Sequence, residues 1–299
     1  MVNILKYLIF LPCLLSALFS GAAIAAKPVY LVLSDNTPLY DEVTTLIKHG
    51  LSADVPLQVV YADDFKGSNV SSNSLLVPVG RRAAEDVALI EGGNSVIYSF
   101  IEAQTLNRIL EGRPKQHWQA SVINQPLERL IRTAKPLIRN DYRNKLLIVI
   151  AESNLWARKQ IDELPSDLRE FIEILVVEKG EVAARLIDDS FYKVAAVVAV
   201  NDTAIWSGNS AKWILHQAYS YQVPVVGYAQ TFQKAGAMIA VYSSLSRIAE
   251  TTSGLINNWM STDQLSGQGF VYSDYQVEVN EFIARALSYQ PDKIKIKHD

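Results

Sequence analysis

Cysteine is almost absent from this 299-residue chain, and that absence restricts its chemistry. The single cysteine, Cys13, lies in an N-terminal stretch ordered like a cleavable signal peptide: Lys6, an apolar segment over residues 8–19, then small residues up to Ala25. Cleavage near Ala25 leaves a mature chain without cysteine, which excludes disulfides, thiol nucleophiles and cysteine metal sites. We therefore expect an exported protein. An uncleaved anchor is the alternative, although the apolar segment is shorter than a bilayer span of about 20 residues.

An excess of basic residues is also absent. The net charge is -3, so the composition indicates no nucleic-acid partner. No pair of histidines has metal-ligand spacing among the four in the chain, which are His49, His117, His216 and His298. The chain also lacks a phosphate-binding loop, a dinucleotide-binding glycine fingerprint and a nucleophile elbow. We therefore expect no metal, no cofactor and no catalytic residues, and thus a protein that is not an enzyme.

Short β-branched runs alternate with amphipathic helical stretches along the chain. Continuous apolar runs of this kind are typical of parallel strands that are covered on both faces. The predicted strands cover residues 29–33, 57–61, 75–79, 95–100 and 121–124, and then 146–150, 172–177, 194–200, 223–226 and 237–241. Helical spacing follows most of these runs, so the pattern predicts α/β structure in two similar units. The chain then continues with a predicted helix over 244–259, a strand over 270–279 and a helix over 280–287.

The clearest part of this pattern is residues 194–230. Two apolar runs there end in polar residues, Asn201 and Asp202 after the first and Tyr228 to Thr231 after the second. In an open parallel sheet, ligands bind beyond the carboxyl ends of the strands. We therefore expect the functional residues to follow the strands.

Several segments together resemble a known protein family. They are AVNDTAIW (199–206), ILHQAYSYQVPVVGYAQTFQKAGAMIAVYSSLSRIAE (214–250), VEVNEFIARAL (277–287), PVGRRAAEDVALIEGG (78–93) and SVINQPLERLIRTAKPLI (121–138). They are similar to the exported substrate-binding proteins of ABC transporters, in the group that includes tryptophan- and tyrosine-type binders. Thr203 and Ala229 depart from the usual proline and serine of that pattern.

The resemblance implies a type I periplasmic-binding-protein fold, with two Rossmann-like α/β lobes of parallel sheets joined by crossover strands. Residues 1–25 would be the signal peptide. Lobe 1 would hold residues 26–123 plus 244–272, and lobe 2 residues 124–243 plus 273–299. It also implies a monomeric periplasmic protein that captures a small polar or amino-acid-like ligand in the interlobe cleft for an ABC importer, with an ABC permease or another inner-membrane protein as partner. The alternative is a periplasmic sensor or interaction module of the same fold without a transported ligand.

Strand-end residues of both lobes are the candidate ligand contacts. They are Ser34, Asp35, Gly80, Arg81 and Ser99 from lobe 1, and Ser153, Asn154, Asn201, Asp202, Tyr228, Gln230 and Thr231 from lobe 2. Asp202 or Asp35 could hold a ligand ammonium, and Gly80, Arg81 and Ser153 could donate to a carboxylate.

Some of these residues have a structural alternative. Tyr228 or Trp206 could stack on an apolar ligand group. The structural alternative for Asp202 is a turn residue that bonds its own backbone, and the alternative for Arg81 is a solvated arginine. We expect Trp206 and Tyr242 to belong to the core.

Overall fold

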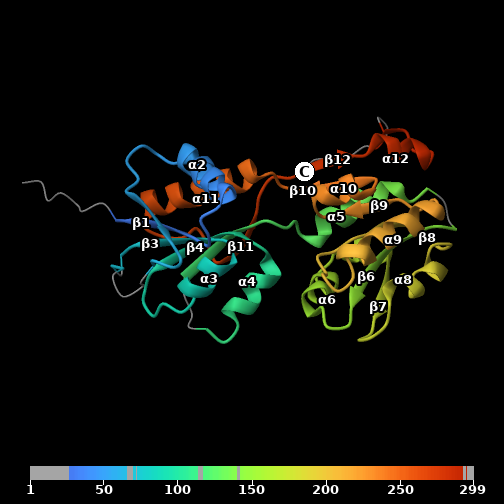
Figure 1. Cartoon of the computed structure of the whole chain (residues 1–299), viewed down its shortest axis with the longest axis horizontal. Coiled ribbons are helices and arrows are strands. Elements are labelled where there is room, and N and C mark those ends of the chain that lie inside the picture. The colour runs from blue at the N-terminus through green and yellow to red at the C-terminus, as the bar shows by residue number, and fades with distance from the viewer. Residues whose placement is uncertain are drawn as a thin grey trace, which may run out of the picture.

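The computed structural model describes residues 27–65, 70–71, 73–113, 117–139, 142–291 and 294. It shows two α/β lobes lying side by side, each built on a six-stranded sheet (Figure 1). The predicted signal peptide and its cleavage near Ala25 lie outside the described residues. Within the described part of the chain, no helix is both long and apolar enough to cross a bilayer.

The sheet of lobe 1 is entirely parallel. Its strands in sheet order are β11 (Gly269–Tyr272), β5 (His117–Val122), β4 (Ser95–Ile101), β3 (Leu75–Val79), β1 (Val29–Leu33) and β2 (Leu57–Tyr61). One face is covered by α2 (Pro38–Gly50) and α11 (Leu245–Thr262), and the other by α3 (Arg81–Val87) and α4 (Ala103–Leu110) (Figure 1). All of β3 is buried, because both faces of a parallel sheet carry helices.

Lobe 2 repeats this plan with one antiparallel edge strand. Its order is β12 (Gln276–Val279), β10 (Ile239–Tyr242), β9 (Val225–Gly227), β8 (Val194–Val198), β6 (Lys145–Ala151) and β7 (Ile172–Val177), with β12 antiparallel. One face is covered by α5 (Leu127–Ala134), α6 (Leu155–Asp162), α7 (Ser166–Arg169) and α12 (Glu281–Ala286). The other is covered by α8 (Ala183–Leu186), α9 (Gly208–Ser220) and α10 (Gln230–Ala235). Short 3₁₀ turns cover Lys135–Leu137 and Asp188–Ser190.

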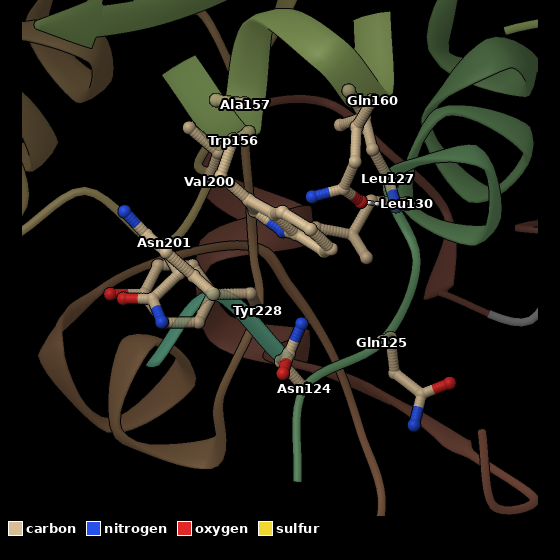
Figure 2. Close-up of a pocket in the computed structure, with 11 residues that line it drawn as sticks. Asn124, Gln125, Leu127, Leu130, Trp156, Ala157, Gln160, Val200, Asn201 and Tyr228 are labelled. Atoms are coloured by element: carbon tan, nitrogen blue, oxygen red, sulfur yellow. Dashed lines mark hydrogen bonds between the residues drawn. The ribbon is translucent and has the colours of Figure 1, made fainter. Parts of the chain in front are cut away.

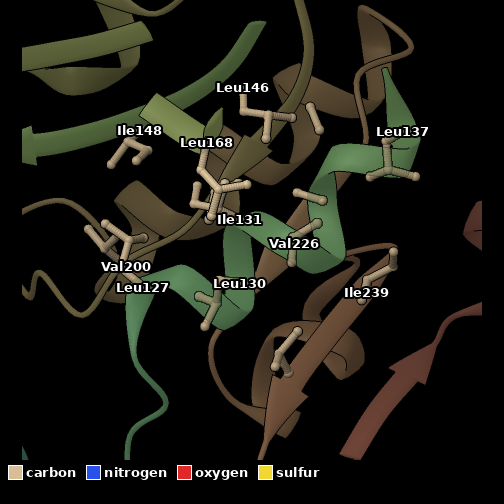
Figure 3. Close-up of a cluster of buried hydrophobic side chains, with 14 of the residues drawn as sticks. Leu127, Leu130, Ile131, Leu137, Leu146, Ile148, Leu168, Val200, Val226 and Ile239 are labelled. Atoms are coloured by element: carbon tan, nitrogen blue, oxygen red, sulfur yellow. The ribbon is translucent and has the colours of Figure 1, made fainter. Parts of the chain in front are cut away.

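Helix α5 anchors the first core of lobe 2. Its residues Leu127, Leu130 and Ile131 recur at helical spacing and are buried against strands β6, β8, β9 and β10 (Figure 3). Since α5 directly follows the crossing from lobe 1, this packing fixes where the chain enters lobe 2.

The chain crosses between the lobes three times: between β5 and α5, between β10 and α11, and between β11 and β12. The side chain of Gln125 in the first crossing donates to Oγ of Ser243 in the second, at 2.6 Å. That hydroxyl donates to the carbonyl of Asp274 in the third, at 2.7 Å. These crossings confirm the predicted fold class of two parallel-sheet lobes joined by crossover strands.

One predicted strand is wrong. Residues 270–279 form two strands in different sheets, β11 in lobe 1 and β12 in lobe 2. Residues 273–275 between them carry the chain across the hinge, and the backbone of Ser273 is held by Nη1 of Arg129 at 2.8 Å. Apolar residues flank the break on both sides, 270–272 before it and Tyr275, Val277 and Val279 after it, so the segment was predicted as one strand despite the polar pair Ser273 and Asp274.

Candidate functional site

Two adjoining pockets lie between the lobes and share Asn124, Asn201 and Tyr228. The pocket that we call the amide pocket has about 450 Å³ of atom-free space and is lined by Gln104, Asn124, Gln125, Leu127, Leu130, Trp156, Ala157, Gln160, Val200, Asn201 and Tyr228 (Figure 2). The hinge pocket has about 1030 Å³ and is lined by Glu102, Ile123, Asn124, Asn201, Tyr228, Ala229, Gln230, Tyr242, Ser243, Ser244, Leu245, Ile248 and Gln276.

The polar lining comes mostly from residues that follow strands. Asn124 follows β5, Asn201 follows β8 and Tyr228 follows β9. The carboxyl ends of parallel strands meet at one edge of each sheet, and here those edges face each other across the hinge. Helix α6 adds Trp156 and Gln160 from lobe 2.

Two amide groups of the amide pocket are oriented by backbone hydrogen bonds. Oδ1 of Asn124 accepts from the backbone nitrogen of Ala103 at 2.8 Å, and Oε1 of Gln160 accepts from that of Leu127 at 3.0 Å. The amide nitrogens of Asn124 and Gln160 therefore point toward the middle of the lining, on either side of the Trp156 indole (Figure 2). Both groups present donors to the pocket.

Trp156 connects the two lobes. Its ring meets that of Phe270 in lobe 1 edge to face, with centroids 5.5 Å apart at 82°. Phe270 in turn contacts Trp118 at 5.4 Å. Nε1 of Trp156 is buried and has no hydrogen-bond partner among the described residues. It is thus a third donor without a protein acceptor in the lining of the amide pocket.

The position of Tyr228 depends on the glycine before it. A Cβ on Gly227 would lie 2.2 Å from Cβ of Phe232, so only glycine lets β9 pass α10 this closely. The Tyr228 ring then packs on Phe232 with centroids 4.7 Å apart. Burial, followed by the charges of Glu102 and Asp202, raises the pKa of Tyr228 to about 12. Its hydroxyl therefore stays protonated at neutral pH.

Of the sequence-predicted contacts, Asn201, Tyr228 and Gln230 line the cleft. Asp202 lies behind it and is only 5% exposed. Its Oδ2 accepts from the backbone nitrogen of Ala151 at 2.8 Å and from Nδ2 of Asn154 at 2.9 Å. Its Oδ1 accepts from the backbone nitrogen of Ala204 at 3.1 Å, which is the turn-type bond considered from the sequence.

Asn154 is buried beside Asp202 and caps α6, where its Oδ1 accepts from the backbone nitrogen of Ala157 at 3.0 Å. Asp202 and Asn154 together tie the end of β6 to the end of β8. Neither belongs to the lining of the amide pocket or the hinge pocket.

The lobe 1 candidates also lie outside the lining of both pockets. Oγ of Ser34 donates to the carbonyl of Val79 at 2.7 Å, and the hydroxyl of Ser99 is 2.6 Å from that of Thr252 in α11. Gly80 has φ 85°, and a Cβ there would lie 2.7 Å from Oγ of Ser34. These three residues hold the strand ends in place.

The remaining candidates are exposed. Arg81 pairs with Glu85 one helical turn away, at 2.7 Å. Asp35, Ser153 and Thr231 are also exposed and are absent from the lining of both pockets.

Other lining residues were missed from the sequence, namely Glu102, Gln104, Asn124, Trp156 and Gln160. Glu102 could have been found, because β4 runs to Ile101 and Glu102 is the first polar residue beyond it. Ser99, which lies inside the strand expected over 95–100, was the candidate from this strand instead.

Two aromatic residues complete the comparison. Tyr242 was expected in the core, but it lines the hinge pocket and its hydroxyl donates to Oε2 of Glu278 at 2.7 Å. Trp206 is 5% exposed and belongs to the core, as expected.

The lining is suited to hydrogen bonding and stacking. Amides can both donate and accept, and the rings of Trp156 and Tyr228 offer apolar faces. In the described part of the chain, no group of three or more His, Cys, Asp and Glu residues has the arrangement of a metal site.

No protein-family model matches the chain, and no curated protein sequence matches it. Solved structures do resemble it. A ligand-free, open substrate-binding protein with adhesive properties from Clostridium difficile has a TM-score of 0.61 at 14% identity, covering 88% of this chain and 95% of that one. An ABC domain from Streptococcus pneumonia in complex with L-Trp has a TM-score of 0.55 at 15% identity, covering 90% and 97%. A periplasmic ribose ABC transporter structure from Conexibacter woesei has a TM-score of 0.53 at 13% identity, covering 93% and 100%.

At these identities the likeness concerns the fold. The chain has the two-lobed α/β fold of type I periplasmic-binding proteins, with two parallel-dominated sheets and a hinge of three crossings. The named ligands of two of these structures, L-Trp and ribose, differ in chemistry, so the fold by itself does not select a ligand.

Proposed function

We propose that this chain is the exported solute-binding component of an ABC importer, and that it binds a small polar ligand without transforming it. The observation that carries the proposal is the interlobe cleft, where amides and aromatic rings from both lobes converge at the ends of the strands. A ligand that contacts Asn124 from the hinge and Asn201 from lobe 2 would favour the closed arrangement of the lobes. The resemblance of segments to ABC substrate-binding proteins, and the fold of the solved structures, both support this role.

In this proposal residues 1–25 direct export to the periplasm and are removed. The mature monomer then has lobe 1 formed by residues 26–123 and 244–272, and lobe 2 by residues 124–243 and 273–299. The partner is a permease in the inner membrane, which would recognise the closed form of the two lobes.

The test is thermal unfolding of the purified mature protein with amino acids, amides, amines, sugars and polyols. A ligand at about a hundred times its dissociation constant stabilises a protein by about 2.7 kcal/mol. For lobes of this size we expect a rise in Tm of about 5–10 °C that saturates with ligand concentration.

Asn201→Ala tests the location of the site. The side-chain amide of Asn201 lines both pockets and makes no hydrogen bond with the described residues, so its loss should weaken binding without unfolding the protein. Asn209→Ala, an exposed position at the start of α9, is the matched control and should bind like the wild type. No stabilisation by any compound would contradict the proposal and favour a sensor or interaction module of the same fold.

A further inference from the structure

The charge of the cleft has one sign. Glu102 is the only ionisable acid or base, tyrosines aside, among the described residues that line the two pockets. The carboxylate of Asp202 lies directly behind the wall, where three N–H donors hold it without a cation. Both carboxylates act on the hydroxyl of Tyr228, which lines both pockets. The ionisable side chain of the lining and the carboxylate behind the wall are therefore acidic, and the nearby cation of α6, Lys159, lies 5.7 Å from the Trp156 ring and pairs with Glu163.

The arginines that flank the hinge do not balance this charge. Nη1 of Arg129 donates to the side-chain oxygen of Gln125 and to the carbonyl of Ser273, and its guanidinium lies 4.8 Å from the centre of the Tyr275 ring. Arg247 in the first turn of α11 pairs with Glu250 at 2.8 Å. Neither arginine lines a pocket, so a ligand anion would meet no cation in the lining.

The carboxylate of Glu102 has capacity left for a ligand. Glu102 stands at the N-cap position of α4 without a side-chain bond to the helix backbone, and its Oε2 accepts from the hydroxyl of Thr105 at 3.3 Å. A carboxylate offers about four acceptor sites, so most of them remain open toward the hinge pocket. An ammonium is the group that matches an acceptor-only, charged site.

The amide pocket has the opposite character. Nδ2 of Asn124, Nε2 of Gln160 and Nε1 of Trp156 are donors, and the acceptor atoms of both amides already bond the backbone. Donors of this kind match any acceptor oxygen, and the nearby carboxylates of Glu102 and Asp202 favour a neutral carbonyl, ether or hydroxyl oxygen over an anionic one.

On the basis of the ligand-binding role proposed above, we infer that the cleft selects a solute with a cationic amine and without a carboxylate or phosphate. The amine pairs with Glu102 in the hinge pocket, a neutral oxygen accepts from Asn124, Gln160 and Trp156 in the amide pocket, and an apolar part lies against Tyr228. A carboxylate in the amide pocket would be buried beside two carboxylates with no counter-ion, which is a repulsive element against free amino acids and sugar acids.

A matched series of compounds tests this ligand class. Tyrosine, leucine and serine are each compared as the free amino acid, the carboxamide and the N-acetylated acid, and glucosamine is compared with glucose and gluconate. We expect measurable binding by calorimetry or thermal shift from carboxamides or from glucosamine, at least about tenfold tighter than from the corresponding acids.

The outcomes separate this inference from the proposed function. A free amino acid that binds as tightly as its carboxamide, or a ligand without an amine found in the general library, overturns the inference and leaves the binding role intact. No binding by any compound overturns both.

Glu102→Gln tests the charged contact itself. It keeps the size and hydrogen-bonding ability of the side chain but removes the charge, so the affinity for the amine should fall about tenfold to a hundredfold. Glu111→Gln is the control, because Glu111 is exposed at the other end of α4 and lines neither pocket. Unchanged amine affinity in E102Q overturns the inference. If E102Q does not fold, E102D replaces it, and its shorter reach should also lower the affinity for the amine.

Discussion

Asp202 offers the sharpest test of how the cleft wall is built. Its carboxylate is 5% exposed and accepts from the backbone nitrogen of Ala151, from Nδ2 of Asn154 and from the backbone nitrogen of Ala204, at 2.8, 2.9 and 3.1 Å. These bonds join the loop after β6 to the loop after β8. In Asp202→Ala, the backbone N–H of Ala151 and one N–H of the Asn154 amide lose their acceptor, while Nδ2 of Asn154 keeps its bond to the carbonyl of Asn201 at 3.3 Å.

The expected change in the free energy of unfolding follows from the hydrogen bonds that each group loses. A buried donor left without a partner costs about 1–3 kcal/mol, and two such donors remain. Removing the carboxylate offsets part of this loss in the free energy of unfolding, because burying the charge was itself unfavourable. We therefore expect D202A to lower the free energy of unfolding by about 3 kcal/mol, or the Tm by about 6–12 °C. D202N keeps one acceptor oxygen and should lose about half as much.

Urea denaturation followed by circular dichroism measures this change for the mature protein without ligand. Asp35→Ala is the control, because Asp35 is exposed and its Oδ1 accepts only from the backbone of its neighbour Asn36. D35A should stay within about 0.5 kcal/mol of the wild type. If D202A were equally mild, the carboxylate would not be holding the two loops together, and the role derived from its three hydrogen bonds would be refuted.

Three further perturbations follow. Gly80→Ala should lower the free energy of unfolding in urea by about 2–3 kcal/mol, because φ is 85° and the new Cβ lies 2.4 Å from a tyrosine hydroxyl. Gly112→Ala is the control: its φ is 69° but its Cβ meets open space, so it should lower the free energy by about 1 kcal/mol. Burial and two carboxylates raise the pKa of Tyr228 to about 12. The contribution of its protonated hydroxyl to the free energy of unfolding is therefore complete below about pH 10 and is lost toward pH 12. The wild type should therefore lose stability there relative to Tyr228→Phe, and parallel profiles would contradict this. Phe270→Ala should cost about 2 kcal/mol and shift the fluorescence of Trp156 to the red, unless their interlobe contact is absent in solution.

The two-lobed architecture could be predicted well because it depends on hydrophobic patterns within short segments. Residues 75–79 and 194–198 are apolar throughout, and both form strands that are buried along their whole length. The polar residues after β8 and β9 could likewise be predicted as cleft residues, and Asn201 and Tyr228 do line it. The break between β11 and β12 was not predicted, because apolar residues on both sides of Ser273 and Asp274 favour one continuous strand.

Within the cleft, the sequence could not show which of two neighbouring residues lines the pocket. Asn201 and Asp202 both follow β8, yet one side chain lines the pockets and the other is buried behind them. The chain bends at Asn201, beyond the end of β8, so a rule that names the strand end cannot choose between the two side chains. Glu102 was also missed, although it is the first polar residue after β4.

The sequence alone therefore determined the alternation of strands and helices, the repetition of that pattern and the general place of the cleft, because each depends on hydrophobic spacing within short segments. Only the tertiary structure decided which polar groups meet there. Trp156, Asn124 and Glu102 come from a helix of lobe 2, a crossing and a strand end of lobe 1, and they become neighbours only when the three crossings set the lobes against each other. The acidic character of the cleft, and hence the class of ligand inferred for it, depends on these residues being brought together.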